Sequence, residues 1–237
     1  MVGDLFAFFA DAQHWTGPEG IPLRAAEHLL YTVLALLIAF AIAFPVGLLI
    51  GHTNRGAFLA INIGNAGRAL PTLGFLVLLV LLTTVGLVPV LVALVVLAIP
   101  PILTATYAGI RNVEPDIVDA SRGMGMTERQ VLFQAELPAA LPIVVGGLRT
   151  ATLQVVSTAT VAAYVSLGGL GRFLIDGLAQ REYPTMLAGA VLVAVLAIAL
   201  DVVFVGLKTV AQPGGLAART KPTSRRPVTN HRQSTAS

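Results

Sequence analysis

Long apolar stretches constrain the fold of this chain more than any other feature of its sequence. A bilayer core is crossed by about 20 mainly apolar residues in helical form. Five stretches have this length and character, at residues 29–51, 69–90, 91–110, 139–165 and 186–207. Lipid cannot satisfy exposed backbone groups, and the stretches do not alternate as barrel strands do. The sequence therefore predicts an all-α membrane protein with about five transmembrane helices.

The composition excludes the common soluble classes. Of the 237 residues, 56% are hydrophobic and only 11% are charged, whereas roughly 25% is usual in soluble domains. Cysteine is absent, which excludes disulfides, thiolate metal sites and cysteine nucleophiles. Residues 1–23 carry three acids and no Lys or Arg, the reverse of a secretory leader. We therefore expect the first apolar stretch to be a retained helix.

Parts of the apolar stretches leave alternatives open. Residues 57–68 fit either an extension of the second span or a helix along the interface. Pro100 and Pro101 inside the third span predict a kink or break, tolerated where a neighbouring helix covers the freed carbonyls. Small residues recur in the first span at Ala43, Gly47 and Gly51. This spacing either allows another helix to approach closely or reflects the general abundance of small residues in such helices.

The basic residues set the expected topology, because Lys and Arg concentrate in cytoplasmic loops. With five spans the termini face opposite sides. One side holds Arg24, Arg172 and Arg181, and the other holds ten, namely Arg55, Arg111, Arg122, Arg129, Lys208, Arg219, Lys221, Arg225, Arg226 and Arg232. We expect an external segment over 1–27, a transmembrane domain over 28–210 and a basic, disordered cytoplasmic tail over 211–237. Topology also explains the basic pI without nucleic acid as a partner.

Motifs for nucleotide, metal or cofactor binding are absent from the sequence. It lacks the phosphate-binding pattern Gly-x-x-x-x-Gly-Lys-Ser/Thr. Its four histidines are expected outside the deep spans, with no second ligand at metal spacing. The glycine-rich residues 168–171 favour a turn outside the membrane over a phosphate cradle. Two ionisable residues lie within spans, Arg149 and Asp201, and their depths allow a buried ion pair. A substrate or proton role is the alternative.

The segment 111–138 has more structure than a plain connector. Pro115 suits the first position of a helix, which Gly125 ends. Thr127, with Gln130 three residues later, predicts a capping box at the start of a second helix. One face of the first helix carries Ile117, Ala120 and Ser121. Two short helices with a glycine joint, lying under the membrane, suit a groove on a cytoplasmic partner.

This segment resembles the signature of permease subunits of binding-protein-dependent ATP-binding-cassette importers. That signature is Glu-Ala-Ala, three residues, Gly, nine residues, Ile, one residue and Leu-Pro. The matching residues are Asp119, Ala120, Ser121, Gly125, Ala135, Leu137 and Pro138. The spacing agrees throughout, with Asp for Glu, Ser for the second Ala and Ala for Ile as departures. The resemblance implies a coupling helix that docks on a separate ATPase subunit.

Short flanking motifs resemble those of one branch of the family, the permeases for glycine betaine, carnitine, choline and proline. They are residues 69–72 (Ala-Leu-Pro-Thr), 106–110 (Thr-Tyr-Ala-Gly-Ile), 122–126 (Arg-Gly-Met-Gly-Met), 147–151 (Gly-Leu-Arg-Thr-Ala) and 166–171 (Ser-Leu-Gly-Gly-Leu-Gly). Methionine permeases share some of these motifs. The resemblance implies a multi-pass protein of the bacterial inner membrane. Its partners would be cytoplasmic ATPase subunits, an extracytoplasmic substrate-binding protein and a second permease subunit, identical or homologous.

The implied function is ATP-driven uptake of a compatible solute, with no catalytic residue or cofactor in this chain. A permease of the same family for methionine or another small solute is one alternative. A stand-alone secondary carrier is another, although it would need ion-coupling groups within the spans, and these are scarce. A membrane-embedded enzyme would need catalytic groups clustered at one depth. The sequence singles out no substrate ligand.

Overall fold

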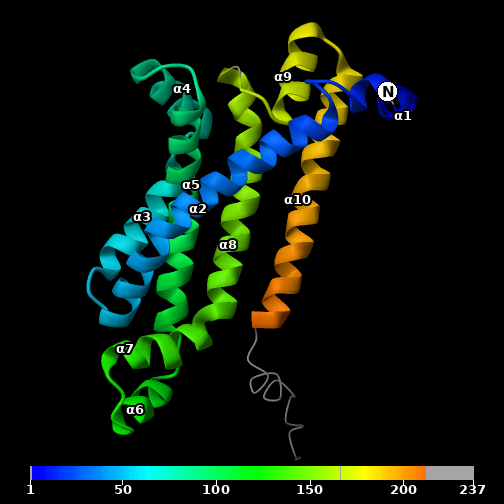
Figure 1. The fold of residues 1–237 in the computed structure, drawn as a ribbon. Coiled ribbons are helices and arrows are strands. Elements are labelled where there is room, and N and C mark those ends of the chain that lie inside the picture. The colour runs from blue at the N-terminus through cyan, green and yellow to red at the C-terminus, as the bar shows by residue number, and fades with distance from the viewer. Residues whose placement is uncertain (1, 166, 212–237) are drawn as a thin grey trace, which may run out of the picture.

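The computed structural model describes residues 2–165 and 167–211, which form helices and turns without a strand (Figure 1). The elements are α1 (Val2–Ala10), η1 (Ala12–Trp15), α2 (Ile21–Thr53), α3 (Ala57–Ala69), α4 (Thr72–Leu82), α5 (Leu87–Arg111), α6 (Pro115–Gly123), α7 (Glu128–Gln130), η2 (Val131–Glu136), α8 (Leu137–Ala159), η3 (Thr160–Val165), α9 (Gly171–Gln180) and α10 (Tyr183–Ala211). Apart from its first residue, the predicted tail 211–237 lies outside the described residues.

Four continuous helical stretches are long and apolar enough to cross a bilayer. They are α2, α5, the stretch Glu128–Val165 that contains α8, and α10 as far as Lys208. The helices α3 and α4 meet at a bend of 94° and, counted together as one broken span, make a fifth candidate. The prediction of an all-α fold with about five spans is thus confirmed.

The predicted second span, residues 69–90, is not a single helix. Helix α3 ends at Ala69, and Leu70 is extended, with φ −70° and ψ 122°. A residue before proline avoids the helical region because the ring of Pro71 crowds its backbone. Helix α4 then has 11 residues, about 16 Å at 1.5 Å per residue, which is too short to cross a bilayer. The prediction of a continuous second span was wrong, and the segment before it is the first arm of the bent pair.

The first span begins earlier than its apolar stretch indicates. Helix α2 has 33 residues and starts at Ile21, with proline in its first turn. Its first two turns carry Arg24 and Glu27, whose Nη1 and Oε2 lie 3.1 Å apart. His28 was expected outside the deep spans, but it lies within α2, fully buried, with its Nε2 3.0 Å from the carbonyl oxygen of Val156. Proline at the N-terminus, rather than the onset of hydropathy, marks where this helix starts.

Helix α5 continues through both of its prolines. Pro101 has no N–H, which leaves the carbonyl of Leu97 without its helical donor. The side chain of Gln154 in α8 donates its Nε2–H to that carbonyl at 3.3 Å. A neighbouring helix thus satisfies a carbonyl that proline frees, as predicted, and α5 continues without a break.

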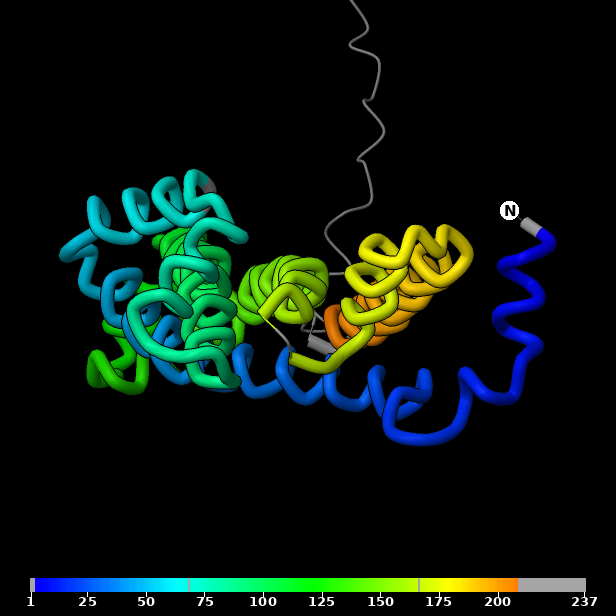
Figure 2. Tube along the Cα trace, turned by 90° about the horizontal axis from the view of Figure 1, so that it is seen from above, coloured from blue at the N-terminus to red at the C-terminus, as the bar shows by residue number. Residues whose placement is uncertain are grey.

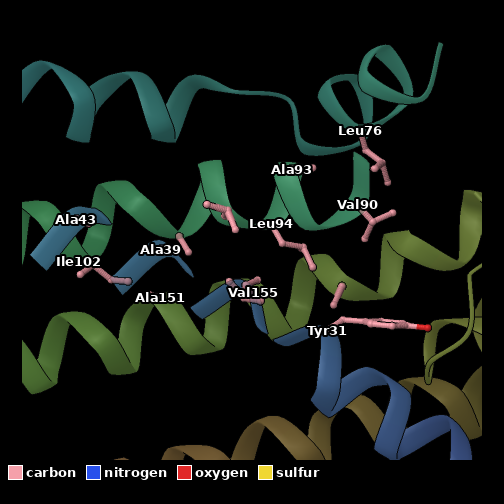
Figure 3. Packing of buried hydrophobic residues seen from close by; sticks show 14 of the residues in the cluster. Tyr31, Ala39, Ala43, Leu76, Val90, Ala93, Leu94, Ile102, Ala151 and Val155 are labelled. Atoms are coloured by element: carbon pink, nitrogen blue, oxygen red, sulfur yellow. The ribbon is translucent and has the colours of Figure 1, made fainter. Parts of the chain in front are cut away.

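Small residues allow α2 to lie directly against α5. A Cβ added at Gly47 would be 2.7 Å from the Cβ of Thr106, and one added at Gly51 would be 2.7 Å from the Cβ of Ile110. Ala43 is buried in the same row, and Figure 3 shows it where α2 passes α5. The row of small residues in the first span is therefore a helix-packing interface.

The long helices connect two opposite ends of the molecule. The loop end holds α6 and α7 with the last turns of α2 and α10, and the N-terminal end holds α1, α4 and α9 (Figure 1). Seen from above, α5, α8 and α10 form a row with α2 along one side (Figure 2). The glycine-rich segment before α9 forms the expected turn. Gly169, at φ +92°, donates its N–H to Glu27 at 2.8 Å, so this turn is attached to α2.

Candidate functional site

The segment between α5 and α8 folds into two short helices at the loop end. Pro115 lies in the first turn of α6. Gly125 follows this helix with φ +84°, a conformation that glycine adopts without strain. Thr127 caps the next helix: its Oγ1 accepts from the Gln130 backbone at 3.4 Å, while Gln130 Oε1 accepts from the Thr127 backbone at 2.8 Å. The glycine joint and the capping box are confirmed.

A bidentate contact crosses the glycine joint. Arg122 in α6 donates from Nε and Nη2 to the two carboxylate oxygens of Glu128, at 2.9 and 3.0 Å. The hydrogen bonds to this carboxylate raise the pKa of Arg122 further above its usual range. Because bidentate geometry fixes direction as well as distance, the contact sets the angle between α6 and α7.

The residues that carry the family resemblance are spread over several elements. They occupy α6 (Asp119, Ala120 and Ser121), the joint (Gly125), η2 (Ala135) and the start of α8 (Leu137 and Pro138). Ser121 is buried and donates to the carbonyl of Ile117 at 2.8 Å. Asp119 is exposed, with its Oδ1 3.9 Å from Nη1 of Arg122. Leu137 packs against the buried cluster that contains Leu48 and Ile110. These residues are placed to shape the loop.

The loop also exposes large apolar side chains. Ile117 and Ala120 share a helical face with Ser121 in the sequence, but both are exposed whereas Ser121 is buried. Phe133 is 49% exposed and Met124 75%. Exposed large apolar side chains can mark interaction sites where they form a contiguous patch. We call Ile117, Met124 and Phe133 the loop patch.

A contact that sequence analysis missed joins the loop to α2. His52, near the end of α2, has its Nδ1 2.6 Å from Oε2 of Glu136 and its Nε2 3.3 Å from Oε2 of Glu128. Glu136 is the last residue of η2, a π-helical segment, which is a feature often found at functional sites. His52 and Glu136 are 84 residues apart, so no local pattern connects them. Their only signal in the sequence is their position at the edges of apolar stretches.

Arg149 of α8 and Asp201 of α10 form an ion pair. The Nε–Oδ1 distance is 2.5 Å and the Nη2–Oδ2 distance is 2.8 Å. The side chains are 40% and 28% exposed, so the pair is not buried within the single chain. Helices α8 and α10 lie side by side (Figure 2), and the ion pair between them leaves both side chains partly exposed. Pairing neutralises two charges that would be expensive in a bilayer.

The chain matches the family described as "Binding-protein-dependent transport system inner membrane component" over residues 43–213. It belongs to this family of permeases. The choline transport system permease protein OpuBB of Bacillus subtilis (strain 168) is 34% identical over 193 residues, which are 81% of this chain and 89% of that protein. The carnitine transport permease protein OpuCB of Listeria monocytogenes is 31% identical, over 83% of this chain and 88% of the relative.

The solved structures agree with this assignment. An inward-facing form of the MetNI methionine ABC transporter has a TM-score of 0.72 to the permease at 24% identity, over 86% of this chain and 100% of that one. A likeness at this identity shows the fold. The permease is therefore an inner-membrane transport subunit with the fold of ABC transporter permeases.

The membrane setting gives meaning to one exposed helix face of the permease. Thr150 and Ser157 of α8 are exposed seven residues apart, on the same face. A groove of about 80 Å³ adjoins Thr150 and is lined by α3, α5 and α8. The outward faces of α2 and α10 carry apolar residues instead, such as Leu37 and Val202. The Thr150 hydroxyl donates to the carbonyl of Gly146 in its own helix at 3.1 Å, and this hydroxyl face of α8 differs in character from the apolar outward faces.

Proposed function

We propose that the permease imports a small polar osmolyte with a quaternary ammonium group, such as glycine betaine, choline or carnitine, or the related solute proline. The observation that carries this proposal is the set of relatives at 31–34% identity named for choline, carnitine and glycine betaine transport. The MetNI likeness, at 24% identity, bears on the fold alone. Methionine is therefore the second substrate class to test.

Energy for import comes, in this proposal, from separate cytoplasmic ATPase subunits that dock on the loop patch. Its exposed apolar side chains suit the groove of a partner. Asp119, Ala120, Ser121, Gly125, Ala135, Leu137 and Pro138 act as the coupling residues, because they shape and anchor the loop. An external substrate-binding protein docks at the N-terminal end, where a polar hollow of about 330 Å³ is lined by Arg24, Arg172 and Asp176, among others.

The loop end faces the cytoplasm in this arrangement. Among the described residues, Arg55, Arg111, Arg122, Arg129 and Lys208 belong to the loop end, against Arg24, Arg172 and Arg181 at the N-terminal end. This bias supports a cytoplasmic loop end by the positive-inside rule. Residues 1–27 are then external, with 21–27 already forming the first turns of α2. Residues 28–210 cross the membrane, and 211–237 form the cytoplasmic tail.

A second permease subunit, identical or homologous, lies opposite the hydroxyl face of α8. The solute passes between the two subunits, along Thr150 and Ser157. The hydroxyl groups at this depth, where the other outward faces are apolar, support the assignment. Arg149 and Asp201 keep a structural role beside this pathway, because each neutralises the other.

Uptake by the complete complex tests the substrate class. The permease, its ATPase subunits and its binding protein are reconstituted in lipid vesicles and given labelled betaine, choline, carnitine, proline and methionine in turn. ATP-dependent uptake of a quaternary ammonium solute or proline is expected. Uptake of methionine alone would contradict the substrate assignment, and uptake without ATP would favour a stand-alone carrier.

The absence of native cysteine allows a second test, on pathway and topology. Ser157→Cys and Thr150→Cys should react with a water-soluble thiol reagent in the assembled complex, whereas Leu37→Cys should not. Met124→Cys should react from the cytoplasmic side only. Reaction of Met124→Cys from outside would refute the topology, and protection of both α8 cysteines would refute the pathway.

A further inference from the structure

A buried carboxylate at the loop end has an imidazole as its partner. The side chain of Glu136 is only 6% exposed, and that of His52 beside it is 13% exposed. A buried carboxylate that lacks a hydrogen-bonded partner of opposite charge is strongly unfavourable. The contact with His52 therefore allows Glu136 to occupy the packed junction between α2 and η2.

The second ring nitrogen of His52 faces another carboxylate, that of Glu128, which also accepts from Arg122. Ionised carboxylates only accept hydrogen bonds, and a neutral imidazole has one N–H to donate. Only the imidazolium form of His52 donates to both carboxylates together. Two further charged groups, Arg111 and Asp119, line the adjoining cavity of about 280 Å³ with His52.

These contacts form a through-space route from the coupling loop to the first span. Arg122 of α6 holds Glu128, and Glu128 contacts His52 of α2. Glu136 continues directly into α8, so the imidazole also joins α2 to the base of that helix. A displacement of α6 therefore reaches α2 through side chains alone, independently of the connecting chain.

Helix α2 extends this route to the opposite end of the permease. It is continuous from Ile21 to Thr53. At its far end Glu27 accepts from the backbone of Gly169, and Nε2 of His28 lies 3.0 Å from the carbonyl oxygen of Val156. Pro45 lies within α2, but the helix is unbroken and attached at both ends, so we expect it to carry a displacement along its length. Movement at His52 is thus carried to the turn that precedes α9.

We propose that His52 is a positioning residue whose imidazolium form clamps the coupling loop to α2 and passes the displacement of the loop to the N-terminal end. The inference rests on the proposed docking of the loop on an ATPase. Because both ring nitrogens of His52 face a carboxylate, replacing the imidazole removes a link between the loop and α2. The amount of solute moved per ATP hydrolysed should therefore fall.

The test compares His52→Gln with the wild type in the reconstituted complex. Labelled uptake per ATP hydrolysed is measured for both. His52→Gln should lower this ratio about tenfold, the effect of losing one charge-assisted hydrogen bond, while ATP hydrolysis continues. His52→Arg keeps a charged donor at this position and should retain most of the ratio.

Arg55→Gln is the matched control, because it removes a positive charge from the exposed turn just after α2. It should leave the ratio unchanged. A wild-type ratio in His52→Gln would overturn the inference and leave the proposed function intact. Absence of ATP-driven uptake by the wild-type complex would refute the proposed function, and the inference with it.

Glu128→Gln keeps the test decisive if His52→Gln fails to assemble. The Glu128 side chain is 60% exposed, so its neutralisation leaves no buried charge. This variant weakens both contacts of Glu128, the one with His52 and the one with Arg122, which are the two links of the route, and should lower the ratio. An unchanged ratio in Glu128→Gln would also overturn the inference.

Discussion

Gly47 offers the sharpest test of how the spans pack. A Cβ at this position would lie 2.7 Å from Cβ and 3.0 Å from Cγ2 of Thr106, and 3.1 Å from the carbonyl oxygen of Leu103. Contacting carbon atoms sit about 3.5–4.0 Å apart. Gly47→Ala therefore requires α2 and α5 to separate by roughly 1 Å. In α8, an added Cβ at Gly146 meets no described atom within 4 Å, which makes Gly146→Ala the matched control.

Two opposing effects set the size of the change. Replacing glycine by alanine within a helix gains about 0.8–1 kcal/mol of helix propensity at either position. Only at Gly47 does overpacking cost about 1–3 kcal/mol. Gly146→Ala should therefore be stabilised by up to about 1 kcal/mol, and Gly47→Ala should be less stable than this control by about 1–3 kcal/mol.

Thermal unfolding of the purified permease in detergent, followed by circular dichroism, measures this difference. Chains of about this length shift in unfolding temperature by roughly 2–4 °C per kcal/mol. The two variants should therefore differ by several degrees, with Gly47→Ala lower. Equal unfolding temperatures would mean that α2 and α5 do not approach along the row of small residues, and the packing argument would fail.

Three further predictions concern single contacts. Gly125→Ala places an L residue at φ +84°, at a cost of about 1–2 kcal/mol, and should lower the uptake per ATP hydrolysed. The control Gly123→Ala, within the helix α6, should leave this ratio unchanged. Equal ratios in the two variants would contradict the role of Gly125 as the glycine joint. Asp201→Asn leaves Arg149 unpaired and should lower the unfolding temperature more than the double variant Arg149→Leu/Asp201→Leu does. A smaller drop in Asp201→Asn than in the double variant would argue against the pair. Gln154→Leu removes the donor to the Leu97 carbonyl and should destabilise the permease by about 1–3 kcal/mol. An unchanged unfolding temperature would contradict this contact.

The fold of segment 111–138 could be predicted because its determinants are local. Proline at a helix start, glycine in the left-handed region and a capping box all act within a few residues. Pro115, Gly125 and the Thr127–Gln130 pair therefore keep in the structure the roles that their spacing indicates. The exposure of Ile117 could not be predicted in the same way. Helical periodicity shows which residues share a face, but not whether that face packs against the rest of the protein.

The bent pair shows why hydropathy alone misplaced one span. Apolar character adds up along a stretch regardless of whether the backbone can stay helical. Pro71 forces Leu70 out of the helical region, although the run around both residues remains apolar. The stronger signal was the proline, which ended α3 and left α4 too short to span by itself.

The contact between His52 and Glu136 was out of reach for a different reason. Each residue alone reads as a polar group at the edge of an apolar stretch, where charge is ordinary. Their meeting depends on how α2 packs on α5 and on the turns of η2, both of which are set by side chains far away in the sequence. A carboxylate close to a predicted span, with no cation one helical turn away, was the only hint.

Helix α8 emerges as the element that distributes motion from the loop. Helices in lipid gain little from apolar burial, so their association depends on close packing and polar contacts. Four polar contacts tie α8 or its base to three other helices, through His28 and His52 to α2, Leu97 to α5 and Asp201 to α10. Because α8 continues directly from segment 111–138, a displacement of that segment should shift these helices together rather than deform one of them.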